Sequence, residues 1–172
     1  MIIVWGTIEA GRVDEVPKLF HVATRFGHVY YLPLIPLGSF AVFEKTASGF
    51  QGAKIPLSLK SVLVAWLRAA SIIGGAGLAI FGCVSLANHA TAEGIACFLA
   101  SALAFGALFA SYKLRIVRQA SYDRAKHLAQ VIGLSPMGLL MIEVAYQRLT
   151  PEQADRELAR LEAAAERAET QS

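Results

Sequence analysis

The chain has 172 residues, of which 55% are hydrophobic and 17% are charged, a more apolar balance than that of ordinary soluble domains. Its net charge is +3, but the basic residues form no cluster, and an apolar chain usually places its cations beside a membrane. Composition therefore favours a membrane protein and argues against a nucleic-acid partner.

The first 58 residues predict a small antiparallel β-domain. Proline cannot donate a ladder hydrogen bond, so Pro33 and Pro36 must lie at an edge, a bulge or a turn, and we expect "IPLGS" (35–39) to be the bend between two strands. The expected strands are rich in β-branched and aromatic residues and are bounded by Gly, Pro or polar residues. They are Ile2–Ile8, His28–Ile35, Gly38–Glu44 and Phe50–Leu57.

One apolar segment of this domain, "RFGHVYYLPLIPLGSF" (25–40), lies well before any membrane-length helix. An exposed apolar patch of this kind usually marks a contact surface. We expect a β-hairpin with one face on the domain core and the other on the membrane or a partner. Its candidate contact residues are Tyr30, Tyr31, Leu34 and Ile35.

Two apolar segments predict transmembrane helices. Residues 62–87 carry one charge in 26 residues, about 39 Å of helix, and residues 94–112 form 19 residues, about 28 Å. The short polar "NHATAE" (88–93) between them requires an antiparallel hairpin, which with its flanks occupies residues 59–118.

The distribution of Lys and Arg predicts the orientation of this hairpin. Six of the 16 lie in residues 1–60, nine in residues 113–172 and none in the connecting loop. Under the positive-inside rule, both termini are cytoplasmic and the chain is a multi-pass protein of the inner membrane. Arg68, about two turns into the first span, is expected to anchor the helix by extending its charge towards the cytoplasmic interface.

The two spans carry many small residues, which allow close helix packing in lipid. These residues indicate self-association or packing on other membrane subunits, or they reflect the ordinary composition of such helices. The candidate packing positions are Gly74, Gly75, Ala79, Gly82, Ala100 and Ala104.

The only two cysteines, Cys83 and Cys97, should lie at similar depth near the outer end of the hairpin. They could form a disulfide, contribute with His89 to a soft-metal site, or serve as small apolar residues.

Residues 119–172 predict a cytoplasmic helical region. "KLRIVRQASYDRAKHLAQVIG" (113–133) continues from the second span at helical spacing and ends at Gly133. Ser135-Pro136 and Thr150-Pro151 are typical helix starts. The last helix carries an apolar stripe that includes Leu158 and Leu161, which should cover its neighbour or, as the alternative, a partner helix.

The segment "RFGHVYYLPLIPLGSFAVFE" (25–44) resembles the F-F-I-P-L-I-P-L-G-(S/K) segment of small bacterial membrane proteins with an N-terminal zinc-ribbon domain. The resemblance extends from Trp5 to about Phe50. In that family two cysteine pairs flank the hairpin and hold zinc, whereas no cysteine precedes Cys83 here, so the thiolate site is absent. His21 and His28 are candidate metal ligands, with ordinary structural roles as the alternative.

We find no nucleotide-binding loop and no nucleophile or metalloprotease motif in the sequence. The expected fold class is therefore membrane α+β, and the expected function is a non-enzymatic accessory, scaffold or assembly subunit without a cofactor. Its partners would be the lipid bilayer and other membrane subunits or copies of itself. The alternative is a membrane-anchored sensor or ligand- or metal-binding module.

Overall fold

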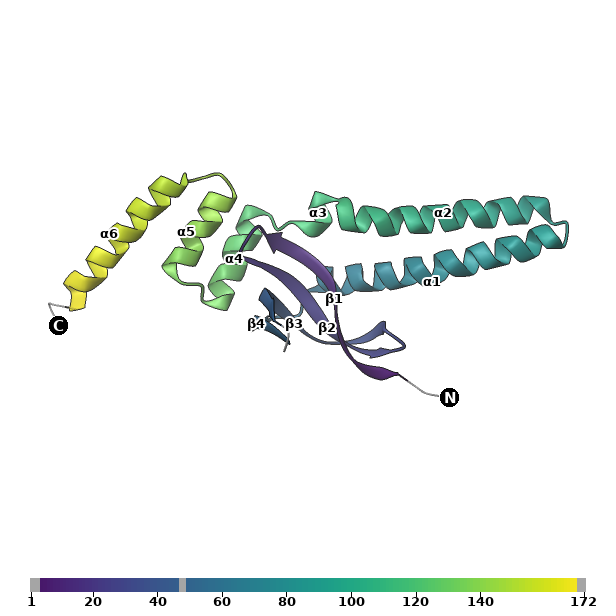
Figure 1. The fold of residues 1–172 in the computed structure, drawn as a ribbon, viewed down its shortest axis with the longest axis horizontal. Helices are drawn as coiled ribbons and strands as arrows, with labels where there is room; N and C mark the ends of the chain where they lie inside the picture. Colours follow the sequence, from purple (N-terminus) through teal and green to yellow (C-terminus); the bar gives the residue numbers. More distant parts are fainter. Residues whose placement is uncertain (1–3, 47–48, 170–172) are drawn as a thin grey trace.

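The structure, a computed structural model, describes residues 4–46 and 49–169. Its fold is an antiparallel sheet followed by helices, two of which are long and apolar, and the molecule is elongated (Figure 1). The α1–α2 hairpin forms one end, the sheet lies in the middle, and α4, α5 and α6 form the other end. The elements are β1 (Trp5–Val16), β2 (Phe20–Val29), β3 (Leu32–Thr46), β4 (Gly49–Ile55), α1 (Leu59–Ala87), α2 (Thr91–Lys113), α3 (Arg115–Arg118), α4 (Tyr122–Ile132), α5 (Pro136–Ala145) and α6 (Pro151–Glu169).

The sheet is antiparallel, as the sequence predicts, and its four strands follow one another in the order β1-β2-β3-β4. Its central turn is not where we expected it, because the chain reverses at Tyr30 and Tyr31, whose φ angles are +50° and +64°. Two consecutive residues with positive φ are typical of a tight hairpin turn. The expected strand His28–Ile35 is therefore split between β2 and β3, and "IPLGS" lies inside β3 and is not a bend.

Bulges accommodate the prolines of β3. Its register on β2 shifts between Arg25 and Phe26 and again between Gly27 and His28, so that Pro36 lies opposite Phe26 and Pro33 opposite His28. Pairing with β4 covers only the later part of β3, from Ser39 onward. The proline segment therefore has one strand neighbour, which confirms that both prolines occupy bulged, edge-like positions.

The expected strands omit most of β1 and all but the end of β2. In β2 every second side chain from Phe20 to Phe26 is buried, namely Phe20, Val22, Thr24 and Phe26, which is the period of one covered sheet face, and Ala23 between them is buried as well. Residues 1–3, at the start of the expected strand Ile2–Ile8, lie outside the described residues.

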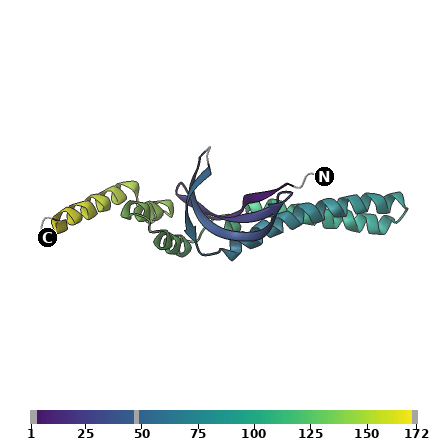
Figure 2. The ribbon, with the colours of Figure 1, turned by 90° about the horizontal axis from the view of Figure 1, so that it is seen from below.

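A shared core joins the N-terminal sheet to the C-terminal helices. The sheet is curved and lies against the first part of α1, while α4 and α5 pack beyond it (Figure 2). The buried residues of this core are Val13, Val16, Phe20, Val22, Ala41, Ile55, Val64, Ala120, Ala125, Leu128, Ala129 and Ile142.

Helices α1 and α2 correspond to the two predicted spans, and each is long and apolar enough to cross a membrane. The expected continuous helix after the second span is wrong. The backbone is extended at Leu114 and again at Gln119, leaving α3 as a short separate helix. The cause is tertiary, since Gln119 bridges Glu15 on β1 and Ala120 N donates to Glu15 O at 3.3 Å.

The predicted helix ends after this break are confirmed. Gly133 ends α4 with φ +70°, and Ser135 caps α5 by accepting from Gly138 N at 3.3 Å. Thr150 and Gln153 hydrogen bond reciprocally at 3.0 and 3.3 Å, forming a capping box at the start of α6. Beyond this start, α6 extends away from the rest of the molecule (Figure 1).

Candidate functional site

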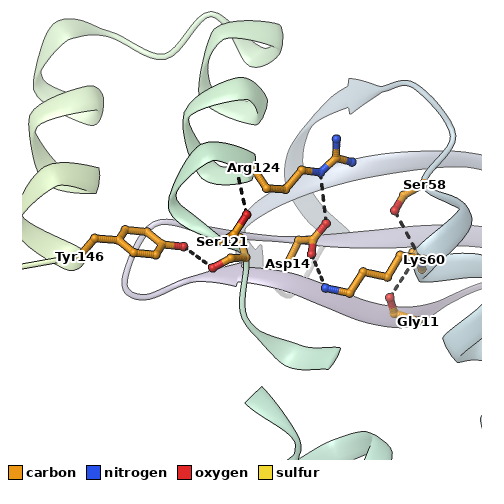
Figure 3. Close-up of polar contacts among 9 residues, drawn as sticks. Gly11, Asp14, Ser58, Lys60, Ser121, Arg124 and Tyr146 are labelled. Carbon is orange, nitrogen blue, oxygen red and sulfur yellow. Dashed lines mark hydrogen bonds and ion pairs between the residues drawn. The ribbon is translucent and has the colours of Figure 1, made fainter. Parts of the chain in front are cut away.

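Asp14 lies at the junction of β1, α1 and α4. Its side chain is only 4% exposed, and its carboxylate accepts from Lys60 Nζ at 2.6 Å and from Arg124 Nε at 3.4 Å (Figure 3). Because a buried carboxylate is costly unless charged partners satisfy it, these two cations stabilise its position. One side chain thereby links the sheet, the first apolar helix and the C-terminal helices.

Beside Asp14, the first turn of α1 makes direct contact with β1. Ser61 Oγ donates to Gly11 O at 2.6 Å (Figure 3). Gly11 has φ +73°, and a Cβ placed on it would lie 1.9 Å from Ser61 O. Only glycine permits this approach.

A second polar link holds the α1 N-terminus to the middle of the sheet. Ser58 N donates to Ser39 Oγ at 2.9 Å, and Ser39 Oγ shares a 2.7 Å hydrogen bond with Thr24 Oγ1. The side chain of Ser58 also accepts from Ser61 N at 3.4 Å as the N-cap of α1. The start of α1 is therefore fixed to three strands of the sheet.

The other side of the junction is held by tyrosines of the C-terminal helices. Tyr146 Oη donates to Ala120 O at 2.7 Å (Figure 3), and burial together with the nearby charge of Asp14 raises the pKa of Tyr146. Tyr122 Oη donates to Glu143 Oε1 at 2.5 Å, and this hydrogen bond, together with Lys126, lowers the pKa of Glu143. These contacts hold α5 against α4 and against the segment that precedes α4.

Glu15, the neighbour of Asp14, connects β1 to α3. Arg118 Nε donates to Glu15 Oε2 at 2.8 Å, and this hydrogen bond is the main reason that the pKa of Glu15 is lowered. Arg12 pairs with the other carboxylate oxygen of Glu15 at 3.2 Å.

A cavity of about 820 Å³ opens beside Asp14. Three cations line it, namely Lys60, Arg115 and Arg124, together with the exposed apolar residues Leu59 and Ile116. The cavity lies between the start of α1 and the segment that follows α2, where the two apolar helices meet the rest of the protein.

Arg68 joins α1 to the end of α2. Its Nε donates to Ser111 Oγ and its Nη2 to Ser111 O, each at 3.0 Å. Its guanidinium lies 3.9 Å from the centre of the Tyr112 ring, a cation–π contact. The charge of Arg68 is therefore held at one defined level of the hairpin.

The four predicted contact residues of the β-hairpin lie at the end of the sheet that faces α1. We call these residues, together with Trp5 on β1, the sheet tip. Trp66 Nε1 of α1 donates to Pro33 O at 3.0 Å and so holds the sheet tip against the helix. All five side chains are exposed: Trp5 by 80%, Tyr30 by 47%, Tyr31 by 69%, Leu34 by 50% and Ile35 by 65%.

Among the predicted packing positions of the spans, Gly75 and Gly82 lie at the α1–α2 interface. A Cβ on Gly75 would lie 3.1 Å from the Phe105 ring, and a Cβ on Gly82 would lie 3.3 Å from Gly94 O. Gly74 faces away from α2, with open space around it. Ala79, Ala100 and Ala104 are half-buried.

Serines also lie at this interface. Ser101 Oγ donates to Gly75 O at 2.7 Å, and Ser71 and Ser85 are buried. The sequence signal for such interface serines is a set of small polar residues at helical spacing in an apolar helix.

Cys83 and Cys97 are free, so the structure does not contain the disulfide considered above. Cys83 is exposed, and Cys97 is half-buried. Cys83 does not face α2 because successive residues of a helix point in directions about 100° apart. Since Gly82 faces α2, Cys83 points away from it.

The candidate metal ligands His21 and His28 are not brought together. They lie at opposite ends of β2, about 23 Å apart along a strand. His28 contributes to the turn instead, since its Nδ1 accepts from Tyr31 N at 3.2 Å and its ring stacks on the Tyr31 ring. Within residues 4–46 and 49–169, no three His, Cys, Asp or Glu side chains are grouped so that they could hold a metal ion.

The apolar stripe of α6 is covered at its start and exposed at Leu161. Ala154 is buried and Leu158 is half-buried, but Leu161 is 47% exposed. A mainly apolar cavity of about 440 Å³ lies under this first part of α6, lined by residues such as Met137 and Met141 of α5. The expected packing of α6 on its own chain therefore extends over about two turns.

Asp14 and Gly11, which organise the junction, were missed from the sequence. Neither belongs to a motif, and their importance comes from partners 46 to 110 positions away. Comparison of the chain with protein-family models, with curated proteins and with solved structures found no match.

Proposed function

We propose that this chain is an integral protein of the inner membrane that crosses the bilayer twice, with both termini in the cytoplasm, and acts as a non-catalytic accessory or scaffold subunit. The observation that carries the proposal is the amount of large apolar side chain left uncovered along α1, α2 and the sheet tip. Isolated exposed apolar residues are ordinary, but extended apolar surfaces mark contact with lipid or with another protein.

The level of Arg68 supports the membrane placement. About 28 Å of helix separate Arg68 from Ala87 at the end of α1, and about 30 Å separate Ser111 from Thr91 at the start of α2. Both lengths match a hydrocarbon core of about 30 Å. The contact between Arg68 and Ser111 would then lie at the cytoplasmic boundary, where an arginine is tolerated.

The sheet tip lies at this same level. Trp66, which holds Pro33, precedes Arg68 by half a turn of α1. Trp and Tyr are enriched at the interface between hydrocarbon and water. Trp5, Tyr30 and Tyr31 would therefore enter the headgroup layer, while the lysines and arginines around the junction remain in the cytoplasm.

The uncovered part of α6 supports a role as a subunit. Leu161 is exposed on a helix that extends away from the sheet and the hairpin (Figure 1). An amphipathic helix with an uncovered apolar stripe fits a partner helix. The outward-facing Gly74 offers a second contact, within the membrane.

The test has a topology arm and a partner arm. Fluorescent-protein and periplasmic-reporter fusions at the C-terminus and at Asn88 should place the C-terminus in the cytoplasm and the loop outside. Native mass spectrometry of the tagged full chain in mild detergent should show a stoichiometric partner or a defined oligomer.

Two variants test whether the exposed stripe of α6 binds the partner. Leu161→Glu should release the partner, whereas the matched control Arg160→Glu, on the neighbouring and already exposed position, should retain it. A monomer in mild detergent, or equal retention by both variants, would contradict the subunit role.

A membrane-anchored sensor is the second candidate, favoured by the way in which Asp14 joins the sheet, α1 and α4. Such a link would pass a displacement from one element to the other two. A soluble ligand that raises the melting temperature of the wild-type chain without any partner would favour this candidate.

A further inference from the structure

We propose that the cavity beside Asp14 is a binding site for a phosphate ester, presented by the headgroup of an anionic phospholipid of the cytoplasmic leaflet. This inference rests on the proposed membrane placement and adds a ligand to it. Three features of the cavity support a lipid headgroup as the ligand: its charges, its depth in the membrane and its apolar rim.

The cavity has an excess of positive charge. Lys60 and Arg124 face the single carboxylate of Asp14, which leaves one of the two cations in excess. Arg115 adds a second excess charge, because its Nε donates to the neutral Gln119 Oε1 at 3.2 Å. Within the described part of the chain, Arg115 has no carboxylate partner.

Arginine is well suited to a phosphate because its planar guanidinium can donate two parallel hydrogen bonds. Arg124 contacts Asp14 through Nε alone, and the side chains of Lys60 and Arg124 are 38% and 42% exposed. Arg115 is exposed as well, so each of the three cations has free surface on which a ligand could bind. A volume of about 820 Å³ accommodates a phospholipid headgroup.

The depth of the cavity matches the headgroup layer. Arg115 follows Ser111 by four residues, just beyond the end of α2, and the headgroup layer on each side is roughly 5–8 Å thick. Lys60 lies about 12 Å beyond Arg68 on α1. The cavity would thus extend across the headgroup layer and past its cytoplasmic edge, the region where basic pockets between membrane helices recognise anionic lipids.

The rim of the cavity distinguishes a lipid from a soluble phosphate ester. Leu59 is 70% exposed and Ile116 is 87% exposed, one on each side of the cavity, and Leu57 beside them is 48% exposed. Exposed aliphatic side chains next to the cations suit the glycerol and upper acyl groups of a lipid. A soluble anion would make no use of them.

The test is a lipid titration of the full-length protein in mild detergent, followed by native mass spectrometry. The ligands are phosphatidylglycerol, zwitterionic phosphatidylcholine and the soluble headgroup analogue glycerol phosphate. The variant is Arg115→Gln, which removes a cation that does not hold Asp14. The matched control is Lys113→Gln, which removes one charge at nearly the same depth outside the cavity lining.

We expect one tightly bound phosphatidylglycerol per chain, preferred over phosphatidylcholine. Arg115→Gln should weaken it about tenfold, and Lys113→Gln should leave the affinity unchanged within about twofold. Equal binding of glycerol phosphate, with the same loss in Arg115→Gln, would confirm a phosphate-ester site but assign it to a soluble ligand. Equal effects of the two variants, or no preference for the anionic lipid, would overturn the proposal.

A separate readout tests the membrane placement. If alkaline carbonate extracts the wild-type chain from membranes, the proposed function fails. If the chain stays in the membrane but shows no lipid preference, only the headgroup site fails.

Discussion

Ser61 Oγ of α1 donates a hydrogen bond to Gly11 O of β1 at 2.6 Å, and at this point the backbones of the helix and the strand come into direct contact. The position of the sheet along α1 depends on this approach. Together with the link between Trp66 and Pro33 it determines how deep the sheet tip lies relative to the two apolar helices.

Replacing Gly11 with alanine should separate the sheet from α1. Its Cβ would lie 1.9 Å from Ser61 O, and φ is +73°, so we expect a loss above about 3 kcal/mol or no folded protein. The matched control is Gly133→Ala, with φ +70° but open space, which should cost about 1–2 kcal/mol. Melting curves in detergent measure both. Similar melting temperatures for the two variants would show that the close approach is not required.

Asp14→Asn should destabilise the junction without altering its shape, because asparagine accepts the φ of +47° found there. The variant exchanges two ion pairs for weaker neutral contacts, and we expect a loss of about 1.5–3 kcal/mol. Glu157→Gln, which affects the exposed pair with Arg160, should cost less than about 0.5 kcal/mol. Equal melting temperatures for the Asp14→Asn and Glu157→Gln variants would mean that the Asp14 ion pairs contribute no net stability.

Trp66→Phe removes the hydrogen bond to Pro33 and leaves Trp5 as the single tryptophan. Because the contact between Ser61 and Gly11 still holds the sheet on α1, the fluorescence of Trp5 then reports the depth of the sheet tip. In vesicles we expect spin labels near the lipid headgroups to quench Trp5 more strongly than labels at the acyl-chain ends. Quenching by aqueous iodide alone would place the sheet tip in water.

Acid should weaken the packing of α4 on α5 through Glu143. Its pKa is lowered, mainly by the Tyr122 hydrogen bond, so its stabilising effect is present above the ordinary value of 4.5 and is lost as the pH falls through the lowered pKa. The melting temperature of the wild type should exceed that of Glu143→Gln at neutral pH and approach it as the pH falls below 4.5. Tyr122→Phe removes the main cause of the shift and should flatten the dependence. A constant difference across this range would contradict the assignment.

Cys83 and Cys97 should remain thiols under oxidising conditions, because Cys83 points away from α2. A disulfide would lower the intact mass by about 2 Da. We expect mass spectrometry of the oxidised protein to show no change on reduction and two free thiols after alkylation. A reductant-dependent shift would mean that α1 rotates relative to the structure.

Local chemistry was sufficient to predict many of the elements. The long apolar runs predicted α1 and α2, and the predicted ends at Gly133, Ser135 and Thr150 are present. Each of these features depends on residues within about one helical turn of one another. The exposure of Tyr30 and Ile35 was also predicted, since an apolar hairpin with bulging prolines has few ways to bury both faces.

The sequence by itself therefore determined the composition and length of the apolar helices, their short connection, the helix caps and the apolar character of the sheet tip. Only the tertiary structure decided the turn at Tyr30, the break at Gln119, the burial of Asp14, the requirement for glycine at position 11 and the outward direction of Cys83. The physical reason is that strand register, helix phase and the pairing of a buried charge depend on residues distant in the chain, which leave no periodic signal around the position they constrain.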